Sequence, residues 1–378
     1  MNAKPTMSIA RRNMMAGKAR TAFSVLGVAI ATLLLLFVIA LYRGWNQELV
    51  GYIRETDADL WVVSSGSDSF FTPSVMFSAV LPKMRATEGV ASVQPLVGRP
   101  MKLRQPGPTI DGVGEGWDTY VIGFNKEAGG PIRVKKGSGT PKVGEIVIDD
   151  VLARTAGVKL GDTVQLGLRT LKVVGISGGG NLVLAQLSFV AKEESDILTG
   201  IDAIVNFALV KTKSGESPVA VGDRIETNVQ GVTAYTSSQF ADNSQKVLRR
   251  SILPILFVIV LMAVIVGTIV VGLTVYTAAV EKEREFGILK AIGVPGPGLL
   301  RVVFEQSLIC GAIGFVVGVA LTVLVANAAQ MILPQVVTLF RWQDIMLVLA
   351  ATALMSLVAS LIPMQRVIRV DTLSVFKA

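Results

Sequence analysis

Four stretches of the chain are almost entirely apolar and are long enough to cross a lipid bilayer as α-helices. They cover residues 22–41, 252–276, 302–326 and 345–362. An α-helix needs about 20 apolar residues to span the hydrocarbon core, and buried helices of soluble proteins are seldom this long and uniformly apolar. We therefore predict four transmembrane helices, at 21–42, 251–278, 301–326 and 344–363.

The segment between the first two apolar stretches, residues 43–250, has the pattern of a folded domain. Short apolar runs alternate with turns rich in glycine and aspartate, which is typical of strands and short helices. We expect strands at 60–64, 120–124, 145–148, 163–166, 171–176 and 207–210, helices at 149–156 and 237–250, and a flexible turn at 178–180. The last helix leads directly into the second apolar stretch. The predicted fold class is an α+β membrane protein, with four transmembrane helices and a large mixed α/β domain between helices 1 and 2.

The net charge of +8 arises beside the apolar stretches, because residues 43–250 contain nearly as many acidic as basic side chains. Lysine and arginine gather in 1–20, 279–300 and 364–378, whereas the short loop 327–343 contains only Arg341. Short loops rich in Lys and Arg stay in the cytoplasm. We therefore expect both termini in the cytoplasm and the 43–250 domain on the extracytoplasmic side. The sequence has no basic stripe with interleaved aromatic residues, so nucleic-acid binding is not expected.

The basic N-terminal segment 1–20 has two interpretations, and both stay open. Met7, Ala10 and Met14 would share one face of a short amphipathic helix lying on the anionic inner leaflet. The segment would otherwise be a simple positively charged flank. A secretory signal peptide is not expected, because the first apolar stretch is too long.

Composition excludes several kinds of chemistry. The chain has no histidine and a single cysteine, Cys310, inside an apolar stretch. This excludes Ser-His-Asp and Cys-His triads and zinc sites built on histidine. No G-x-x-x-x-G-K-[ST] sequence occurs, so ATP binding through a P-loop is not expected. Because no acid, base and nucleophile cluster together either, we expect a non-catalytic membrane subunit that binds no cofactor and no metal ion.

The most informative cytoplasmic segment is 279–300. Its charged first half is expected to prolong the second transmembrane helix, after which Phe286, Leu289 and Ile292 recur at helical spacing and form a small apolar face. A rigid turn is expected at 293–298. Two interpretations are open: a short helix that docks into a groove of a partner, or an interfacial helix that reconnects two spans. The candidate coupling residues are Glu283, Arg284, Glu285, Phe286, Gly287, Ile288, Leu289, Lys290, Ala291, Ile292 and Gly293.

The third apolar stretch contains small residues at helical spacing and one acid. Gly314 and Gly318 form a G-x-x-x-G pair, which lets helix backbones approach closely in lipid, and Gly311 extends this face. The alternative is a glycine face without a packing partner. Glu305 is expensive to expose to acyl chains, so we expect it at the cytoplasmic interface or facing the helix bundle. A proton-relay role is a further alternative.

The segment 283–293 resembles the signature of FtsX-like permeases of the ABC superfamily, which includes MacB-type exporters that work by mechanotransmission. Glu305 with Gly311, Gly314 and Gly318 resembles the family pattern E-x5-G-x2-G-x3-G. Residues 12–13 and 20–30 resemble the entry to the first helix of the family. Residues 147–176 resemble its periplasmic core domain, and the four-helix layout with one large first loop also matches.

The resemblance implies a complex in which two copies of the permease work with two ATPase subunits that bind ATP and Mg²⁺. Residues 283–293 would be the coupling helix against the ATPase, which is expected on a separate chain. The implied location is the bacterial inner membrane, and the implied function is export or extracytoplasmic handling of a hydrophobic or amphipathic substrate. A membrane-fusion protein is a further partner that the family allows. The alternatives are a non-transporting transducer that activates a cell-wall hydrolase and, from another class, a membrane-bound enzyme.

Overall fold

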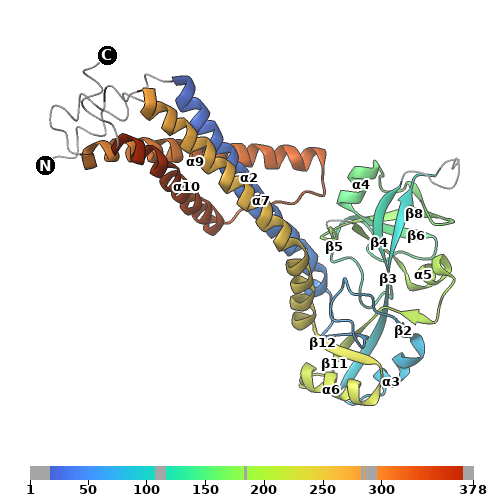
Figure 1. Ribbon diagram of the computed structural model, residues 1–378. Helices are drawn as coiled ribbons and strands as arrows, with labels where there is room; N and C mark the ends of the chain where they lie inside the picture. The colour runs from blue at the N-terminus through green and yellow to red at the C-terminus, as the bar shows by residue number, and fades with distance from the viewer. Residues whose placement is uncertain (1–17, 107–115, 183–184, 282–284, 286–295, 369–378) are drawn as a thin grey trace. The chain divides into compact units, whose positions relative to one another are not determined.

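The computed structural model describes residues 18–106, 116–182, 185–281, 285 and 296–368. It divides into two compact units, each described here by itself. The helical unit contains residues 1–43, 254–331 and 338–378, and the sheet unit contains residues 44–253 and 332–337. Three of the four boundaries fall inside long helices, which Figure 1 shows, so single helices contribute to both units.

Four long helices account for the apolar stretches: α2 (Lys18–Glu55), α7 (Ser237–Glu281), α9 (Gly296–Ile332) and α10 (Trp342–Ile368). Each contains a segment that is long and apolar enough to cross a membrane, which confirms the prediction of four such helices. Helices α2 and α7 are much longer than the predicted spans. The turn expected at 293–298 is wrong for its last residues, because α9 begins at Gly296. Pro297 fits there, since the fixed φ of proline suits the first helical turn.

The sheet unit is built on a ten-stranded mixed sheet in the order β12-β1-β11-β3-β4-β9-β6-β8-β5, with β7 pairing β3 and β8. A separate two-stranded sheet pairs β2 (Met76–Phe77) with β10 (Ile204–Val205). The strands of the main sheet are β1 (Leu60–Ser64), β3 (Val90–Arg104), β4 (Trp117–Phe124), β5 (Arg133–Gly137), β6 (Glu145–Asp149), β7 (Thr163–Leu166), β8 (Arg169–Gly178), β9 (Gln186–Ala191), β11 (Phe207–Thr212) and β12 (Val232–Thr236). The shorter helices are α3 (Leu81–Arg85), α4 (Asp150–Ala156), α5 (Lys192–Thr199) and α6 (Pro218–Asn228).

Strands inside this sheet, such as β1 and β9, are buried on both faces and are largely apolar, whereas β5 at one edge is exposed throughout. Successive side chains of a strand point to opposite faces. In β1, Leu60 and Val62 therefore join a core that also contains residues of α3 and α6, while Trp61 and Val63 join a core rich in aromatic rings. A third core packs α4 against β6 and β8.

The predicted strands at 60–64 and 163–166 have the same bounds in the structure, and the other predicted strands are found with longer bounds. Strand β3 was not expected, because Pro95, Gly98 and Pro100 interrupt its apolar pattern. Its pairing explains why it tolerates proline: residues 90–96 pair β11, whereas residues 96–103 pair β4. Each proline thus lies where β3 has one ladder partner, so its missing N–H falls on the unpaired side.

Candidate functional site

Most of the coupling residues predicted from sequence, Glu283–Gly293, lie outside the described residues. Within this segment the structure describes Glu285, which is helical and exposed. The described helices on either side are α7, which ends at Glu281, and α9, which begins at Gly296. The coupling role of these residues therefore stays a prediction.

The three glycines predicted for helix packing lie on α9 at close helix crossings within the helical unit. A Cβ atom added to Gly314 would lie 2.5 Å from Val28 Cβ, and one added to Gly318 would lie 2.8 Å from the carbonyl oxygen of Ala29, both on α2. A Cβ atom on Gly311 would lie 2.3 Å from Ser356 Oγ of α10. The Ala29 oxygen beside Gly318 belongs to the backbone of α2, so α9 approaches α2 there at a distance that only glycine permits, whereas the Ser356 hydroxyl beside Gly311 can rotate.

Glu305 lies on the same helix and is mostly buried. Its Oε1 atom accepts a hydrogen bond from Arg301 Nε at 2.9 Å, one helical turn away, and the Glu305 side chain is 19% exposed. An i,i+4 pair of this kind compensates part of the desolvation of the acid. Its role in the function stays a prediction.

The first helix is held to the start of α10 by an ion pair that the sequence did not indicate. Arg43 donates from Nε and Nη2 to the two carboxylate oxygens of Asp344, at 2.6 and 2.7 Å. The Asp344 side chain is only 3% exposed. Two parallel hydrogen bonds fix the angle as well as the distance between the partners. The backbone N–H of Leu339 also donates to the carbonyl oxygen of Ala40, at 2.9 Å.

In the sheet unit, the ends of α2 and α7 are part of the aromatic core. Tyr52 of α2 and Phe240 of α7 are fully buried, and the Phe240 ring stacks on Trp61 with ring centroids 5.1 Å apart. The Tyr52 hydroxyl donates to the carbonyl oxygen of Gly129 at 2.6 Å, and the Ser237 hydroxyl donates to that of Ala58 at 2.5 Å. Burying aromatic side chains of this size stabilises the attachment by several kcal/mol. The C-terminal end of α2 and the N-terminal end of α7 are therefore integral parts of the sheet unit.

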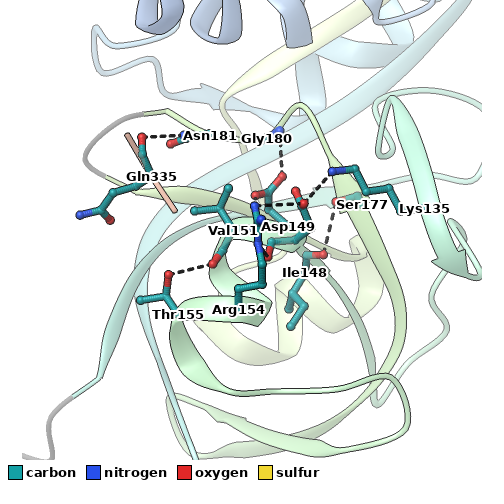
Figure 2. A network of polar contacts seen from close by, with 11 residues as sticks. Lys135, Ile148, Asp149, Val151, Arg154, Thr155, Ser177, Gly180, Asn181 and Gln335 are labelled. Atoms are coloured by element: carbon teal, nitrogen blue, oxygen red, sulfur yellow. Dashed lines mark hydrogen bonds and ion pairs between the residues drawn. The ribbon is translucent and has the colours of Figure 1, made fainter. Parts of the chain in front are cut away.

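The sheet unit also contains a buried polar network around Asp149, at the junction of β6 and α4 (Figure 2). Asp149 Oδ1 accepts the backbone N–H of Val151 at 2.9 Å, which caps α4, and Oδ2 accepts the N–H of Gly180 at 3.0 Å. The next residue, Asn181, donates to the carbonyl oxygen of Gln335 at 3.0 Å. The flexible turn expected at 178–180 is wrong for Gly178, which ends β8. Gly180 and Asn181, the residues that follow, link Asp149 to the segment that joins α9 to α10.

Burial dominates the electrostatics of this network. The Asp149 side chain is shielded from water, which raises its pKa to about 6, although the two backbone donors favour the charged form. Burial also raises the pKa of Glu48 on α2, against the opposing effect of Arg133. Two ion pairs lie beside this network: Asp150 pairs with Lys135 and with Arg154, at 2.6 and 3.3 Å. The sequence indicated Asp149 only as a helix start, because its burial depends on the 179–181 turn.

Within the described residues, no group of three or more His, Cys, Asp or Glu side chains could hold a metal ion. What the described polar groups do is structural: they cap helices, tie the ends of α2 and α7 to the sheet unit, and order the 179–181 turn.

Together these features define a class of membrane proteins in which apolar helices are combined with a large mixed α/β unit inserted after the first helix. The sequence model of the MacB-like periplasmic core domain matches residues 21–228, and that of the FtsX-like permease C-terminal region matches residues 257–372. The chain belongs to the FtsX-like, MacB-type family of ABC transporter permeases.

Relatives of this chain carry corresponding names. An uncharacterized ABC transporter permease of Mycobacterium tuberculosis is 27% identical over 373 residues, which cover 97% of this chain and 98% of that protein. The macrolide export ATP-binding/permease protein MacB of Escherichia coli is 22% identical, over 97% of this chain and 60% of MacB. Among solved structures, the periplasmic region of MacB from Actinobacillus actinomycetemcomitans superimposes with a TM-score of 0.38 at 12% identity, covering 50% of this chain and 94% of that one.

Proposed function

We propose that this chain is the non-catalytic permease subunit of an ABC complex that uses ATP hydrolysis on another polypeptide to handle a hydrophobic or amphipathic substrate outside the membrane. The sheet unit would lie on the extracytoplasmic side, with both termini and the 283–293 segment in the cytoplasm. Two copies of the permease would work with two ATPase subunits in the bacterial inner membrane. A membrane-fusion protein would be an additional partner in an efflux complex.

The observation that carries this proposal is the continuity of α7. The helix begins at Ser237, where it is bonded to the sheet unit, and ends at Glu281, just before the proposed coupling segment. An uninterrupted helix transmits a push or a rotation along its axis, and a buried end such as Phe240 cannot move without its surroundings. Pro254 lies inside α7 and removes one backbone N–H there. Movement imposed by an ATPase at 283–293 would thus reach the sheet unit directly.

The names of relatives support the ATPase partner. The Escherichia coli relative is named as both an ATP-binding and a permease protein, and this chain matches 60% of its length. The Mycobacterium tuberculosis relative is named as a permease alone, and this chain matches 98% of its length. The ATPase is therefore proposed to be a separate chain, with ATP and Mg²⁺ bound there. A transducer that activates a cell-wall hydrolase would use the same mechanical parts, and a hydrolase gene beside this one would indicate that function instead of export.

Co-purification tests the coupling. The tagged full chain, isolated in mild detergent, is expected to retain a nucleotide-binding chain. Phe286→Asp places a charge on the apolar face of the coupling segment and is expected to weaken that association by at least about 2 kcal/mol, roughly thirtyfold, as for an interface hot spot. The readout is the amount of ATPase retained and its ATP turnover.

Phe77→Asp is the matched control, because Phe77 is 69% exposed in the sheet unit. This variant is expected to retain the ATPase like the original chain. The proposal is wrong if no nucleotide-binding chain accompanies the protein, or if Phe286→Asp leaves both the association and the cellular activity intact.

A further inference from the structure

The sheet unit contains a pocket of about 360 Å³ that the functions considered so far leave unexplained. Its floor is formed by residues of three neighbouring strands, Gly98 of β3, Tyr120 of β4 and Phe207 of β11. Its other wall is the segment 70–75, which precedes β2. The volume falls within the range of roughly 300–1,000 Å³ that is usual for small-molecule sites.

The lining of this pocket is uncharged. Among the described residues that form it, phenylalanine, tyrosine, proline, valine and leucine side chains predominate, and no Lys, Arg, Asp or Glu is found. The polar side chains on the wall already have partners: Ser74 Oγ donates to the carbonyl oxygen of Asn206 at 2.6 Å, and Asn206 Nδ2 donates to that of Ser74 at 2.7 Å. An ionic group inside this pocket would lose its hydration without gaining a counter-charge, so the pocket suits an uncharged, largely apolar guest.

One polar group remains available to such a guest. Among the described residues, none forms a hydrogen bond that shifts the pKa of the Tyr120 hydroxyl. Burial raises the pKa of Tyr120 to about 12, so the hydroxyl stays protonated and can donate at any physiological pH. The tyrosine ring also depends on Gly98, because a Cβ atom at that position would lie 2.6 Å from the Tyr120 hydroxyl oxygen.

The entrance of the pocket is unusually apolar for a surface. Phe71 and Val75 are 39% and 57% exposed, and both belong to the wall segment. Phe71 meets the buried Phe70 edge to face, with centroids 5.8 Å apart. Large side chains gathered at the mouth of an apolar pocket are typical of sites that receive an apolar ligand.

We propose that this pocket binds the uncharged ring portion of an amphipathic small molecule, packed between Phe71 and Tyr120, with an oxygen acceptor on the ligand bonded to the Tyr120 hydroxyl. The charged or strongly polar part of the ligand would stay outside, in water. This inference rests on the proposed function, of which it specifies the substrate class.

The position of the pocket connects its occupancy to the long helices. Phe70, on its inner wall, stacks on Phe207 with centroids 5.2 Å apart and meets Tyr52 of α2 edge to face at 5.9 Å. The backbone N–H of Phe70 donates to Ser244 Oγ of α7 at 2.9 Å. A ligand that displaces the 70–75 segment would therefore act on the aromatic core in which α2 and α7 end.

Photolabelling of the full chain in lipid nanodiscs tests this proposal. Benzophenone is a suitable probe, because it is neutral, carries two aromatic rings and one ketone oxygen, and forms covalent adducts that mass spectrometry can assign to residues. We expect saturable labelling concentrated in 70–75 and around Gly98 and Tyr120. Tyr120→Phe removes only the hydroxyl. It is expected to raise the benzophenone concentration needed for half-maximal labelling roughly three- to tenfold.

Phe71→Asp places a charge at the entrance and is expected to abolish labelling of the pocket. Phe77→Asp is the matched control, since Phe77 is a more exposed phenylalanine, at 69% against 39%, that does not line the pocket. Near-ultraviolet circular dichroism of each variant checks that the aromatic core is intact. Labelling that does not saturate, that spreads over the apolar helices without enrichment in the pocket, or that persists in a folded Phe71→Asp protein overturns the proposal. None of these outcomes affects the ATPase co-purification, so the two proposals fail separately.

Discussion

Asp149 shows how one residue combines a structural role with a thermodynamic cost. Its two carboxylate oxygens accept the N–H groups of Val151 and Gly180, which caps α4 and positions the 179–181 turn. The same burial that makes these bonds strong disfavours the negative charge. Asp149 thus positions α4 and the turn, while the burial of its charge lowers the stability of the fold at neutral pH.

The sign of the pH dependence follows from the raised pKa. The folded protein binds the Asp149 proton more tightly than the unfolded chain does, so the contribution of Asp149 to stability decreases as the pH rises from about 4 to about 6. Raising the pKa from 3.8 to about 6 corresponds to about 3 kcal/mol. Asp149→Asn cannot ionise, and we expect it to remove this part of the pH dependence. Thermal unfolding of the full chain in mild detergent between pH 4 and pH 7 measures it.

Asp162→Asn serves as the comparison, because Asp162 is exposed and its carboxylate bonds one backbone N–H, that of Lys159. This variant is expected to keep the pH dependence of the original chain. If the melting temperatures of Asp149→Asn and the original chain change equally with pH, the burial of Asp149 does not control the pH dependence of stability.

At the scale of elements, side chains determine which surfaces of helices and strands can pair. Strand β12 lies at an edge of the sheet, where free N–H groups would pair with another strand. Two of them are occupied: Ala234 N–H donates to Glu226 Oε1 at 2.8 Å, and Thr236 N–H donates to Gln239 Oε1 at 3.0 Å. On α9 the absence of side chains has the corresponding effect: Gly314 and Gly318 let the α9 backbone lie close to α2.

This glycine face can be tested by filling it. Gly314→Ile inserts a branched side chain where even a Cβ atom would lie 2.5 Å from Val28. We expect a destabilisation of about 1–3 kcal/mol, as for overpacked cores, with lower yield of monodisperse protein and a lower melting temperature in detergent. Val316→Ile adds one methylene on the same helix at a position that is 66% exposed, and a change within about 0.5 kcal/mol is expected there. Similar losses in both variants would argue against close packing of α9 on α2.

At the scale of the whole molecule, α2 and α7 matter because each contributes residues to both compact units. Their apolar parts belong to the helical unit, whereas Tyr52 and Phe240 belong to the aromatic core of the sheet unit. The apolar parts of these helices can face the lipid of a bilayer, whereas Tyr52 and Phe240 are buried by the folded core of the sheet unit. Which side of the membrane carries the sheet unit rests on the distribution of Lys and Arg.

Thiol labelling measures this orientation directly. In a Cys310→Ser background, which removes the single cysteine, Leu168→Cys reports on the sheet unit, where Leu168 is fully exposed. Glu281→Cys reports on the end of α7. We expect a membrane-impermeant maleimide to label the cysteine at 168 in intact spheroplasts, and the cysteine at 281 only after permeabilisation. Labelling of both positions from the same side would contradict the predicted topology and the lever proposed for α7.

What the sequence determined by itself was set by local chemistry. Long uninterrupted apolar stretches identify the four long helices, and short apolar runs bounded by turn residues, such as 60–64, identify strands, because both patterns depend on neighbours along the chain. The motif at 283–293 and the glycines of α9 likewise indicated the family before any contact was known. Strand β3, by contrast, is revealed only by pairing, because Pro95 and Pro100 are tolerated where β3 has a single ladder partner. The burial of Asp149, the Arg43–Asp344 ion pair and the pocket beside Tyr120 were likewise decided by tertiary structure. Each joins residues from segments distant in sequence, and a chain's local pattern does not specify which distant partners desolvate a side chain or leave a cavity beside it.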